Sequence, residues 1–124
     1  MNLIDSSAWL EYFTDGHNAS HFAKPIEAVN DLIVPTICLY EVFKVIVRQK
    51  GEEIGLQVIS AMQQGTIIEL TSEIAIQATK VSLEHQLAMA DSIILATAYL
   101  HNAVLWTQDD DFSSIYGVQY FAKR

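Results

Sequence analysis

Three apolar stretches of this chain each contain a single acidic residue, and this pattern constrains how the chain can fold. The acids are Asp5 in residues 1–10, Glu41 in residues 32–47 and Asp91 in residues 87–100. Apolar runs form the buried faces of strands and helices, whereas burying an unpaired carboxylate costs several kcal/mol, roughly. We therefore expect each acid to lie at the edge of a buried element, where a specific interaction compensates for the loss of water.

A fourth acidic site follows another short apolar run. After Val104, Leu105 and Trp106, the chain continues as Thr107, Gln108, Asp109, Asp110, Asp111 and Phe112. A shared cation explains several such acids at once, because hard cations such as Mg²⁺ bind carboxylate oxygens. The sequence therefore predicts a metal site that is assembled from acids far apart in the chain.

The composition predicts a single cytoplasmic domain over residues 1–124. A length of 124 residues is near the commonest domain size, and a hydrophobic content of 51% is enough for a packed core. No apolar run reaches the roughly 18 residues of a membrane-spanning helix. The N-terminus lacks the basic region of a signal peptide, and the single cysteine, Cys38, cannot form an internal disulfide.

Short apolar strands alternate with longer helical segments along the chain. We expect strands at residues 2–4, 32–34, 66–70, 103–106 and 118–121. We expect helices at residues 6–13, 20–30, 35–50, 52–64, 72–86 and 91–100. Strands separated by helices indicate an α/β fold, with a mostly parallel sheet of about four to five strands and helices on both faces.

The four acidic sites follow the predicted strands in a way that brings them together. Asp5 comes directly after the first strand and Asp109 comes after the fourth. Asp91 begins the helix that leads into the fourth strand, and Glu41 lies two turns into the helix after the second strand. In open α/β sheets, functional sites lie outside the carboxyl ends of the strands. We therefore expect the four carboxylates to meet at this edge of the sheet.

Each acid also has a structural explanation that involves no cation. Asp5 and Asp91 could cap the helices that they begin, because Asp is a good N-cap residue. Glu41 could form a surface ion pair with Lys44, three residues later in the same helix, although the surrounding run is apolar. Residues 109–111 could form a solvated turn. Glu41 has the weakest of these alternative explanations.

Four short motifs carry the acids along the chain. They are Leu3-Ile4-Asp5-Ser6-Ser7, Pro35 to Tyr40 leading into Glu41, Ala90-Asp91-Ser92, and Thr107 to Phe112. In type and order they resemble the motifs of the PIN-domain family, and most closely those of the VapC-type toxin ribonucleases of toxin–antitoxin pairs. The resemblance covers essentially the whole chain. It implies a PIN-like three-layer α/β fold and Mg²⁺- or Mn²⁺-dependent hydrolysis of RNA phosphodiester bonds.

The resemblance also implies a catalytic and metal-binding quartet, which consists of Asp5, Glu41, Asp91 and Asp109. We expect Asp5 and Asp91 to be direct metal ligands. Asp109 is expected to be a ligand or to hold a metal-bound water, and Glu41 to be a ligand or to position the attacking water. General metal chemistry supports the same roles without the resemblance, because a metal held by carboxylates can polarise a phosphate and activate water.

Several neighbours of the quartet have expected supporting roles. Asp111 matches a more variable acid of the family and is expected to assist through water, while Ser7 and Thr107 match hydroxyl residues that orient the acids. Two positions depart from the pattern. Asp110 is an additional acid, expected to face solvent, and Gln108 stands where many relatives carry an arginine.

Lys44 and Arg48 are the expected contacts to RNA phosphates. They follow Glu41 at i+3 and i+7, so the three residues share one helix face. An ordinary solvated helix face is the alternative for these two basic residues.

The formal net charge of −8 contrasts with the positive charge that nonspecific RNA binding usually requires. It is compatible with a cation in the acidic site and with a basic protein partner. From the resemblance we expect a cognate basic antitoxin, a homodimer, and an RNA substrate such as tRNA or another structured RNA. Two alternatives remain: a PIN-domain RNA-processing nuclease without an antitoxin, and a catalytically inactive metal-binding interaction module.

Overall fold

A five-stranded parallel sheet forms the centre of the computed structural model, which describes residues 1–124. The strands are β1 (Asn2–Ile4), β2 (Leu32–Pro35), β3 (Thr66–Ile68), β4 (Val104–Thr107) and β5 (Gln119–Tyr120). Their order across the sheet is β3-β2-β1-β4-β5, and every neighbouring pair is parallel. The predicted parallel α/β sheet is confirmed.

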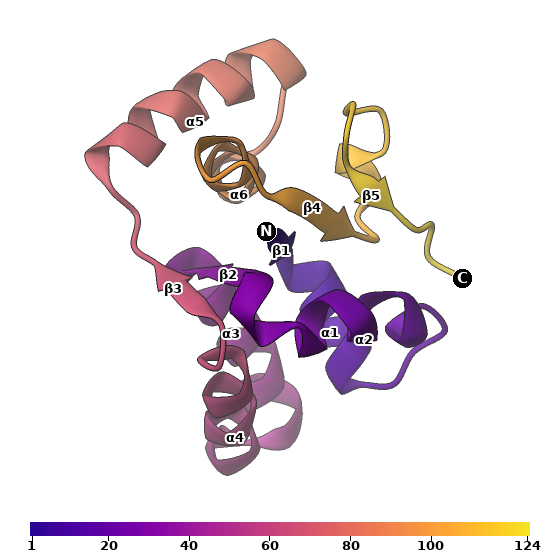
Figure 1. Cartoon of the computed structure of the whole chain (residues 1–124). Coiled ribbons are helices and arrows are strands. Elements are labelled where there is room, and N and C mark those ends of the chain that lie inside the picture. The colour runs from indigo at the N-terminus through magenta and orange to yellow at the C-terminus, as the bar shows by residue number, and fades with distance from the viewer.

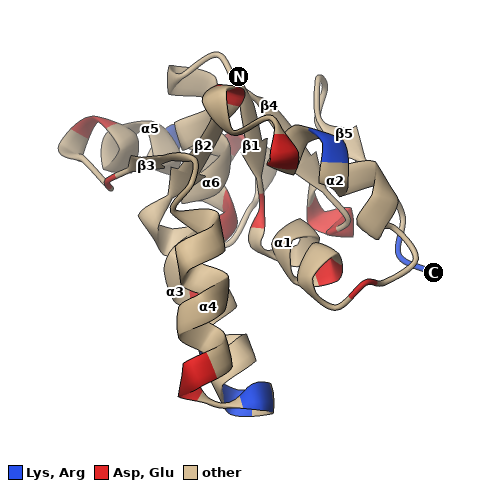
Figure 2. Cartoon of the chain, turned by 60° about the horizontal axis from the view of Figure 1, so that its bottom comes forward, with Lys and Arg blue, Asp and Glu red and all other residues tan.

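Helices cover both faces of the sheet and produce three layers (Figure 1). They are α1 (Ser6–Phe13), α2 (Ala19–Glu27), α3 (Thr36–Lys50), α4 (Glu52–Met62), α5 (Ser72–His85) and α6 (Met89–Leu100). The pair α5 and α6 lies on one side of the sheet, and α1 to α4 lie on the other. The α3–α4 hairpin projects away from the sheet, and its outer end carries both basic and acidic residues (Figure 2). None of the helices combines the length and the apolar character that crossing a bilayer requires.

The direction in which strands are added to the sheet reverses once, and this reversal locates the expected site. From β1 the chain proceeds to β2 and β3 on one side, and it then returns through α5 and α6 to β4 on the other side. Ile4 at the end of β1 is paired with Trp106 of β4, so the carboxyl ends of these two strands are adjacent. Ligands bind at such switch points in open α/β sheets. A functional site is therefore expected among the residues that follow β1 and β4.

Buried side chains pack the strands and helices against one another. All four residues of β2 are buried, as expected for a strand covered on both faces. Trp9 of α1 and Phe22 of α2 are among the largest fully buried side chains. Phe112 is also fully buried and anchors η2 (Asp110–Phe112), a 3-10 turn just after β4. This anchor fixes the loop that carries the run of three aspartates.

Helix boundaries differ from the sequence expectations at several places, of which two concern more than the length of a last turn. Helix α6 begins at Met89 with Ala88 as its N-cap, so Asp91 lies within the first turn and does not start the helix. The helix expected at residues 20–30 ends at Glu27 and is followed by the separate 3-10 turn η1 (Val29–Asp31). The predicted end of α3 at Gly51 is confirmed, and a φ of 92° there explains the glycine.

Candidate active site

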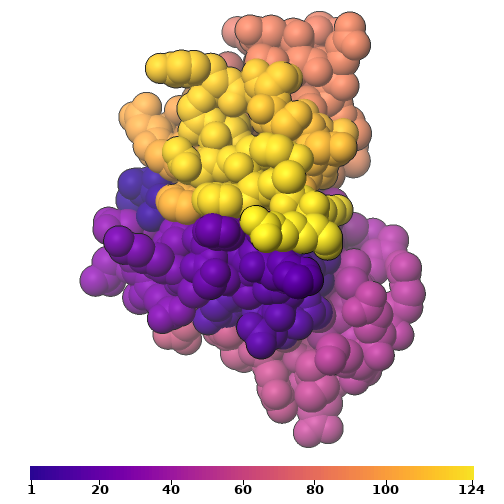
Figure 3. All heavy atoms as spheres, turned by 90° about the vertical axis from the view of Figure 1, so that its right-hand side faces the viewer, coloured from indigo at the N-terminus to yellow at the C-terminus, as the bar shows by residue number.

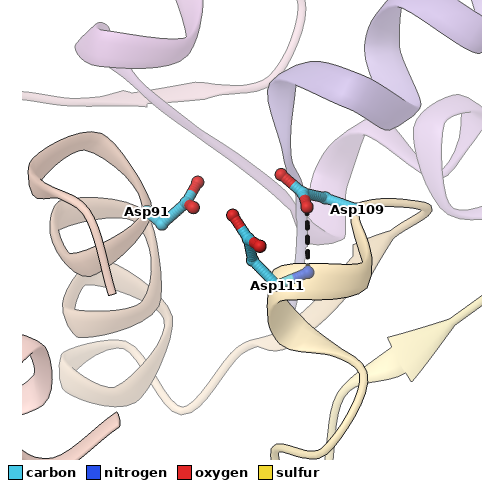
Figure 4. Close-up of side chains that lie close together, drawn as sticks. All are labelled: Asp91, Asp109 and Asp111. Atoms are coloured by element: carbon cyan, nitrogen blue, oxygen red, sulfur yellow. Dashed lines mark hydrogen bonds between the residues drawn. The ribbon is translucent and has the colours of Figure 1, made fainter. Parts of the chain in front are cut away.

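Three carboxylates converge where α6 meets the loop after β4. Asp91, Asp109 and Asp111 each offer one oxygen, and these oxygens all lie within 4.8 Å of one another. Figure 4 shows Asp91 reaching from α6 toward Asp111 and Asp109, which approach from the opposite side. Asp91 and Asp109 are half-buried, whereas Asp111 is exposed. The group therefore has one open side through which a ligand can enter.

The η2 turn explains how Asp111 joins Asp109. The Asp109 carboxylate caps the turn, because its Oδ1 accepts the backbone N–H of Asp111 at 2.9 Å. Burial of Phe112 holds the other end of the turn against the core. Two acids separated by one residue are thereby brought to the same side, while Asp110 between them is exposed as predicted.

Asp5 lies at the carboxyl end of β1, where it is 3% exposed. Its Oδ1 accepts hydrogen bonds from the Ala8 backbone N–H at 2.9 Å and from Ser7 Oγ at 2.8 Å. Its Oδ2 accepts one from Thr107 Oγ1 at 2.7 Å. The capping explanation for Asp5 is therefore correct, since Asp5 is the N-cap of α1. The cap leaves Oδ2 with a single protein donor and a further lone pair.

The Thr107 hydroxyl joins Asp5 to the acidic loop. Besides donating to Asp5, its oxygen accepts the backbone N–H of Asp109 at 2.9 Å. Ser7 Oγ similarly donates to Asp5 and accepts the backbone N–H of Gln108 at 3.3 Å. Both hydroxyls therefore hold the chain after β4 in a fixed position beside the end of β1.

Burial and mutual repulsion perturb the acids of this site. Burial raises the pKa of Asp5 from 3.8 to about 6, and the charge of Asp109 adds to this shift, while the hydrogen bonds from Thr107, Ala8 and Ser7 oppose it. Burial is also the main reason that the pKa of Asp91 rises from 3.8 to about 7, followed by the charges of Asp109, Asp111 and Asp5. These carboxylates therefore resist being ionised together.

No basic side chain relieves that repulsion. No lysine or arginine of the structure forms an ion pair, so none of the acids near β1 and β4 has a basic partner. Clustered carboxylate oxygens with uncompensated negative charge fit Mg²⁺ or Mn²⁺, which prefer oxygen ligands; Mg²⁺ in particular binds through a few carboxylates while keeping several waters. The residues that would hold such an ion are Asp91, Asp109 and Asp111, with Asp5 next to them.

Glu41 lies apart from this group but close to Asp5. It is half-buried on α3, and its Oε1 accepts a hydrogen bond from Ser6 Oγ at 2.7 Å. The surface ion pair with Lys44 considered from the sequence is absent, and Lys44 Nζ lies instead 5.7 Å from the ring centroid of Tyr40. Glu41 Oε2 accepts no protein hydrogen bond. This oxygen is free to interact with water or substrate.

The buried Cys38 is near enough to Asp5 and Glu41 to feel their charges. Its thiol points toward the carbonyl oxygen of Ile4, with an S···O distance of 3.9 Å. Burial raises the pKa of the Cys38 thiol far above its ordinary value, and the charges of Asp5 and Glu41 raise it further. The thiol therefore stays protonated.

The structure thus distributes the predicted residues unequally. Asp91 and Asp109 come together as expected, and Asp111 joins them more closely than Asp5 and Glu41 do. Lys44 and Arg48 are exposed on α3. Ser6 was not expected at the site, although it lies inside the first motif; its contact with Glu41 spans 35 positions. Asn18 was also not expected there; it contacts Gln108 across 90 positions and carries no local signal.

Comparison with known proteins gives matches of family and fold. The family model described as PIN domain matches residues 3–118. A chain of a toxin–antitoxin complex from Klebsiella pneumoniae is 28% identical, with a TM-score of 0.80 and coverage of 95% of each chain. No curated protein matches the chain significantly.

Two further solved structures share the fold at lower identity. One is VapC20 from Mycobacterium tuberculosis, described as a sarcin-ricin loop cleaving toxin, with 16% identity, a TM-score of 0.77 and coverage of 96% of this chain and 98% of that one. The other is DNA-bound VapBC from Salmonella typhimurium, with 15% identity, a TM-score of 0.74 and coverage of 98% of each chain. At these identities the likeness concerns the fold alone.

Proposed function

The chain belongs to the PIN-domain family, and on this premise we propose that it is a Mg²⁺- or Mn²⁺-dependent endoribonuclease that hydrolyses RNA phosphodiester bonds. One observation carries the proposal: oxygens of Asp91, Asp109 and Asp111 lie within 4.8 Å of one another, and no basic side chain neutralises them. A site of this kind is costly for stability unless a cation occupies it.

The proposed roles follow from the hydrogen bonds of each acid. Asp91, Asp109 and Asp111 would hold the metal, and Asp5 Oδ2 has a lone pair left for the ion or for one of its waters. When bound, the metal would polarise the scissile phosphate and lower the pKa of a water molecule. Glu41, fixed through Oε1 by Ser6, would use Oε2 to accept a hydrogen bond from the attacking water and orient it toward phosphorus.

The direct test compares isosteric variants that remove one charge. Asp5→Asn and Asp91→Asn proteins should fold, as judged by circular dichroism, and should lose cleavage of RNA in Mg²⁺ or Mn²⁺. Asp31→Asn is the matched control, because Asp31 is exposed and lies just before β2, at the opposite edge of the sheet. Unchanged cleavage by both site variants would contradict the proposal.

We further propose that the chain is the toxin of a toxin–antitoxin pair, with a basic antitoxin as its partner and tRNA or another structured RNA as its substrate. Support comes from the 28% identical chain, which belongs to a toxin–antitoxin complex, and from the net charge of −8, which suits a basic partner. Expression should arrest growth, and a small protein encoded beside the gene should relieve the arrest. A processing nuclease without an antitoxin would show no such relief, and an inactive metal-binding module would cleave no RNA.

The proposed homodimer rests on the resemblance to VapC-type toxins. Light scattering after size-exclusion chromatography measures the mass directly against the 13.9 kDa of one chain. A mass of one chain at micromolar concentration would contradict the dimer without affecting the proposed chemistry.

A further inference from the structure

A hollow lies between the loop after β4 and the C-terminal segment. Its volume is about 250 Å³, and it is lined by Gln108, Asp110, Tyr120, Ala122 and Lys123. Gln108 and Asp110 flank Asp109 in the chain, so the hollow and the proposed catalytic group are built from the same loop after β4. The proposed metal site uses none of the five lining side chains.

The Gln108 amide is held so that only its nitrogen is available. Gln108 is 8% exposed, and its Oε1 accepts a hydrogen bond from Asn18 Nδ2 at 3.1 Å. Asn18 Nδ2 also donates to the carbonyl oxygen of Ala122 at 2.9 Å. Because a carbonyl oxygen can only accept, the Asn18 atom must be nitrogen and its Gln108 partner must be oxygen. Gln108 Nε2 is left without a protein acceptor, in a residue that is more than nine-tenths buried.

The C-terminal segment that lines the hollow is also fixed in place. Phe121 is stacked between His21 and Trp106, with ring centroids 4.3 Å and 6.2 Å away, and its backbone N–H donates to the Thr107 carbonyl at 2.9 Å. Figure 3 shows the C-terminal segment resting on the N-terminal helices. The Gln108 amide and the backbone on either side of Phe121 are therefore held in place without a ligand.

The polar groups of the hollow match one nucleobase. Gln108 Nε2 offers N–H donors, and Asp110 offers a carboxylate that accepts two parallel N–H groups. The Watson–Crick edge of guanine presents the complement, an O6 acceptor beside the N1–H and N2–H donors. Adenine, cytosine and uracil lack two adjacent donors beside an acceptor. Bases in unpaired RNA are read on this edge, and the ammonium group of Lys123 suits the attached phosphate.

We propose that this hollow binds a guanine base of the RNA substrate next to the cleaved phosphate. This proposal rests on the proposed ribonuclease function. Asp110 and Gln108 read the base, and Lys123 contacts the backbone. Asn18 is a positioning residue, because it acts only through the orientation of Gln108. The additional acid and the glutamine, which are the two departures from the family pattern, thereby have a common role in specificity.

Nuclear magnetic resonance tests the site without any metal or cleavage. In EDTA, guanosine 5′-monophosphate should shift the side-chain amide signals of Gln108 and the backbone signal of Lys123 in a saturable way. Adenosine 5′-monophosphate and inorganic phosphate should bind at least tenfold more weakly at these signals. Equal responses to the two nucleotides, or a full response to phosphate alone, would overturn the proposal.

Variants make the same test specific to the base-reading residue. Asp110→Asn should weaken guanosine 5′-monophosphate binding about tenfold, as expected for loss of a bidentate base contact. Asp31→Asn, at an exposed acid elsewhere, should bind like the wild type. Retained selectivity for guanosine 5′-monophosphate in Asp110→Asn would overturn the assignment.

Cleavage of RNA separates this proposal from the proposed function. Wild-type cuts in Mn²⁺ should cluster beside guanine, and Asp110→Asn should lose that preference, whereas Asp91→Asn should lose all cutting. Cleavage without selective guanosine 5′-monophosphate binding would refute the guanine site alone. Selective binding without cleavage of any RNA would refute the nuclease and leave the binding site standing.

Discussion

Thr107 and Asp5 are joined by a hydrogen bond of 2.7 Å between the Thr107 hydroxyl and Asp5 Oδ2. The two residues are 102 positions apart in the chain, yet Asp5 directly follows β1 and Thr107 ends the neighbouring parallel strand β4. The Thr107 oxygen also accepts the backbone N–H of Asp109 at 2.9 Å. One buried hydroxyl therefore sets the position of one proposed site acid and the backbone of another.

Thr107→Val tests this link, because valine keeps the shape of threonine and removes the hydroxyl. The variant leaves the Asp109 N–H and Asp5 Oδ2 without a partner, which should lower the free energy of unfolding by about 1–3 kcal/mol. Urea unfolding measures this change, and calorimetric titration should show weaker Mn²⁺ binding. Thr107→Ser keeps the hydroxyl and should preserve metal affinity. Equal metal affinity in the valine and serine variants would show that the link does not position the site.

The fold was predictable where short-range patterns decide it. Alternating apolar strands and helices require a parallel sheet, and Asp5 and Asp109 follow strands whose carboxyl ends share an edge. Asp91 was expected to begin the helix before β4. It lies instead in the first turn of α6 and makes no capping hydrogen bond, so its location was predicted correctly only to within one turn. Helix boundaries depend on tertiary packing as well as on local preference.

The finer grouping of the acids was not predictable in the same way. Asp111 joins Asp91 because η2 folds back on itself around the buried Phe112, which is a tertiary effect. The contact of Asn18 with Gln108 spans 90 positions and depends on where α2 is packed. Neither relationship has a local signature in the sequence, because each requires the completed sheet to exist.

The stability of the metal-free protein should fall as pH rises through the range in which Asp5 ionises. The pKa of Asp5 is about 6 in the folded protein against 3.8 as its ordinary value, so the folded state binds more protons between these pH values. The free energy of unfolding therefore decreases with pH there, by about 3 kcal/mol from this residue. The contribution is complete below pH 3.8 and is lost as pH passes about 6.

Asp5→Asn isolates that contribution, because asparagine does not ionise. Urea unfolding in EDTA at pH 4 and pH 7 should show a smaller decrease for the variant than for the wild type. Other acids titrate in both proteins, so the difference between the two profiles reports on Asp5. Parallel profiles would mean that Asp5 ionises at its ordinary pKa despite its burial.

Asp91→Asn should have opposite effects on stability without and with metal. At pH 8 in EDTA, the variant removes a charge that Asp109 and Asp111 repel, and it should be more stable than the wild type by about 1 kcal/mol after allowance for solvent screening. Mg²⁺ that binds only the folded state should raise the Tm of the wild type. At a Mg²⁺ concentration one hundred times Kd, the free energy of unfolding should increase by about 2.7 kcal/mol. The variant should gain much less.

Thermal unfolding with and without Mg²⁺ measures both effects, and Asp111→Asn in the same series shows whether the exposed acid is a ligand. Asp31→Asn should follow the wild type in both conditions. If Asp91→Asn is less stable than the wild type in EDTA, a stabilising contact of Asp91 outweighs its repulsion by Asp109 and Asp111. An undiminished response to Mg²⁺ would place the ion elsewhere.

Lys44 and Arg48 should contribute to RNA binding through charge alone. Both are exposed on α3, the helix that carries Glu41, and neither forms an ion pair within the protein. Replacing both by glutamine should weaken binding to RNA at low salt and reduce the slope of log K against log salt by about 0.7 per charge lost. Lys80→Gln, at an exposed lysine of α5 on the other side of the sheet, is the control. Fluorescence anisotropy at several salt concentrations measures the slope, and a double variant with the wild-type slope would remove α3 from the RNA path.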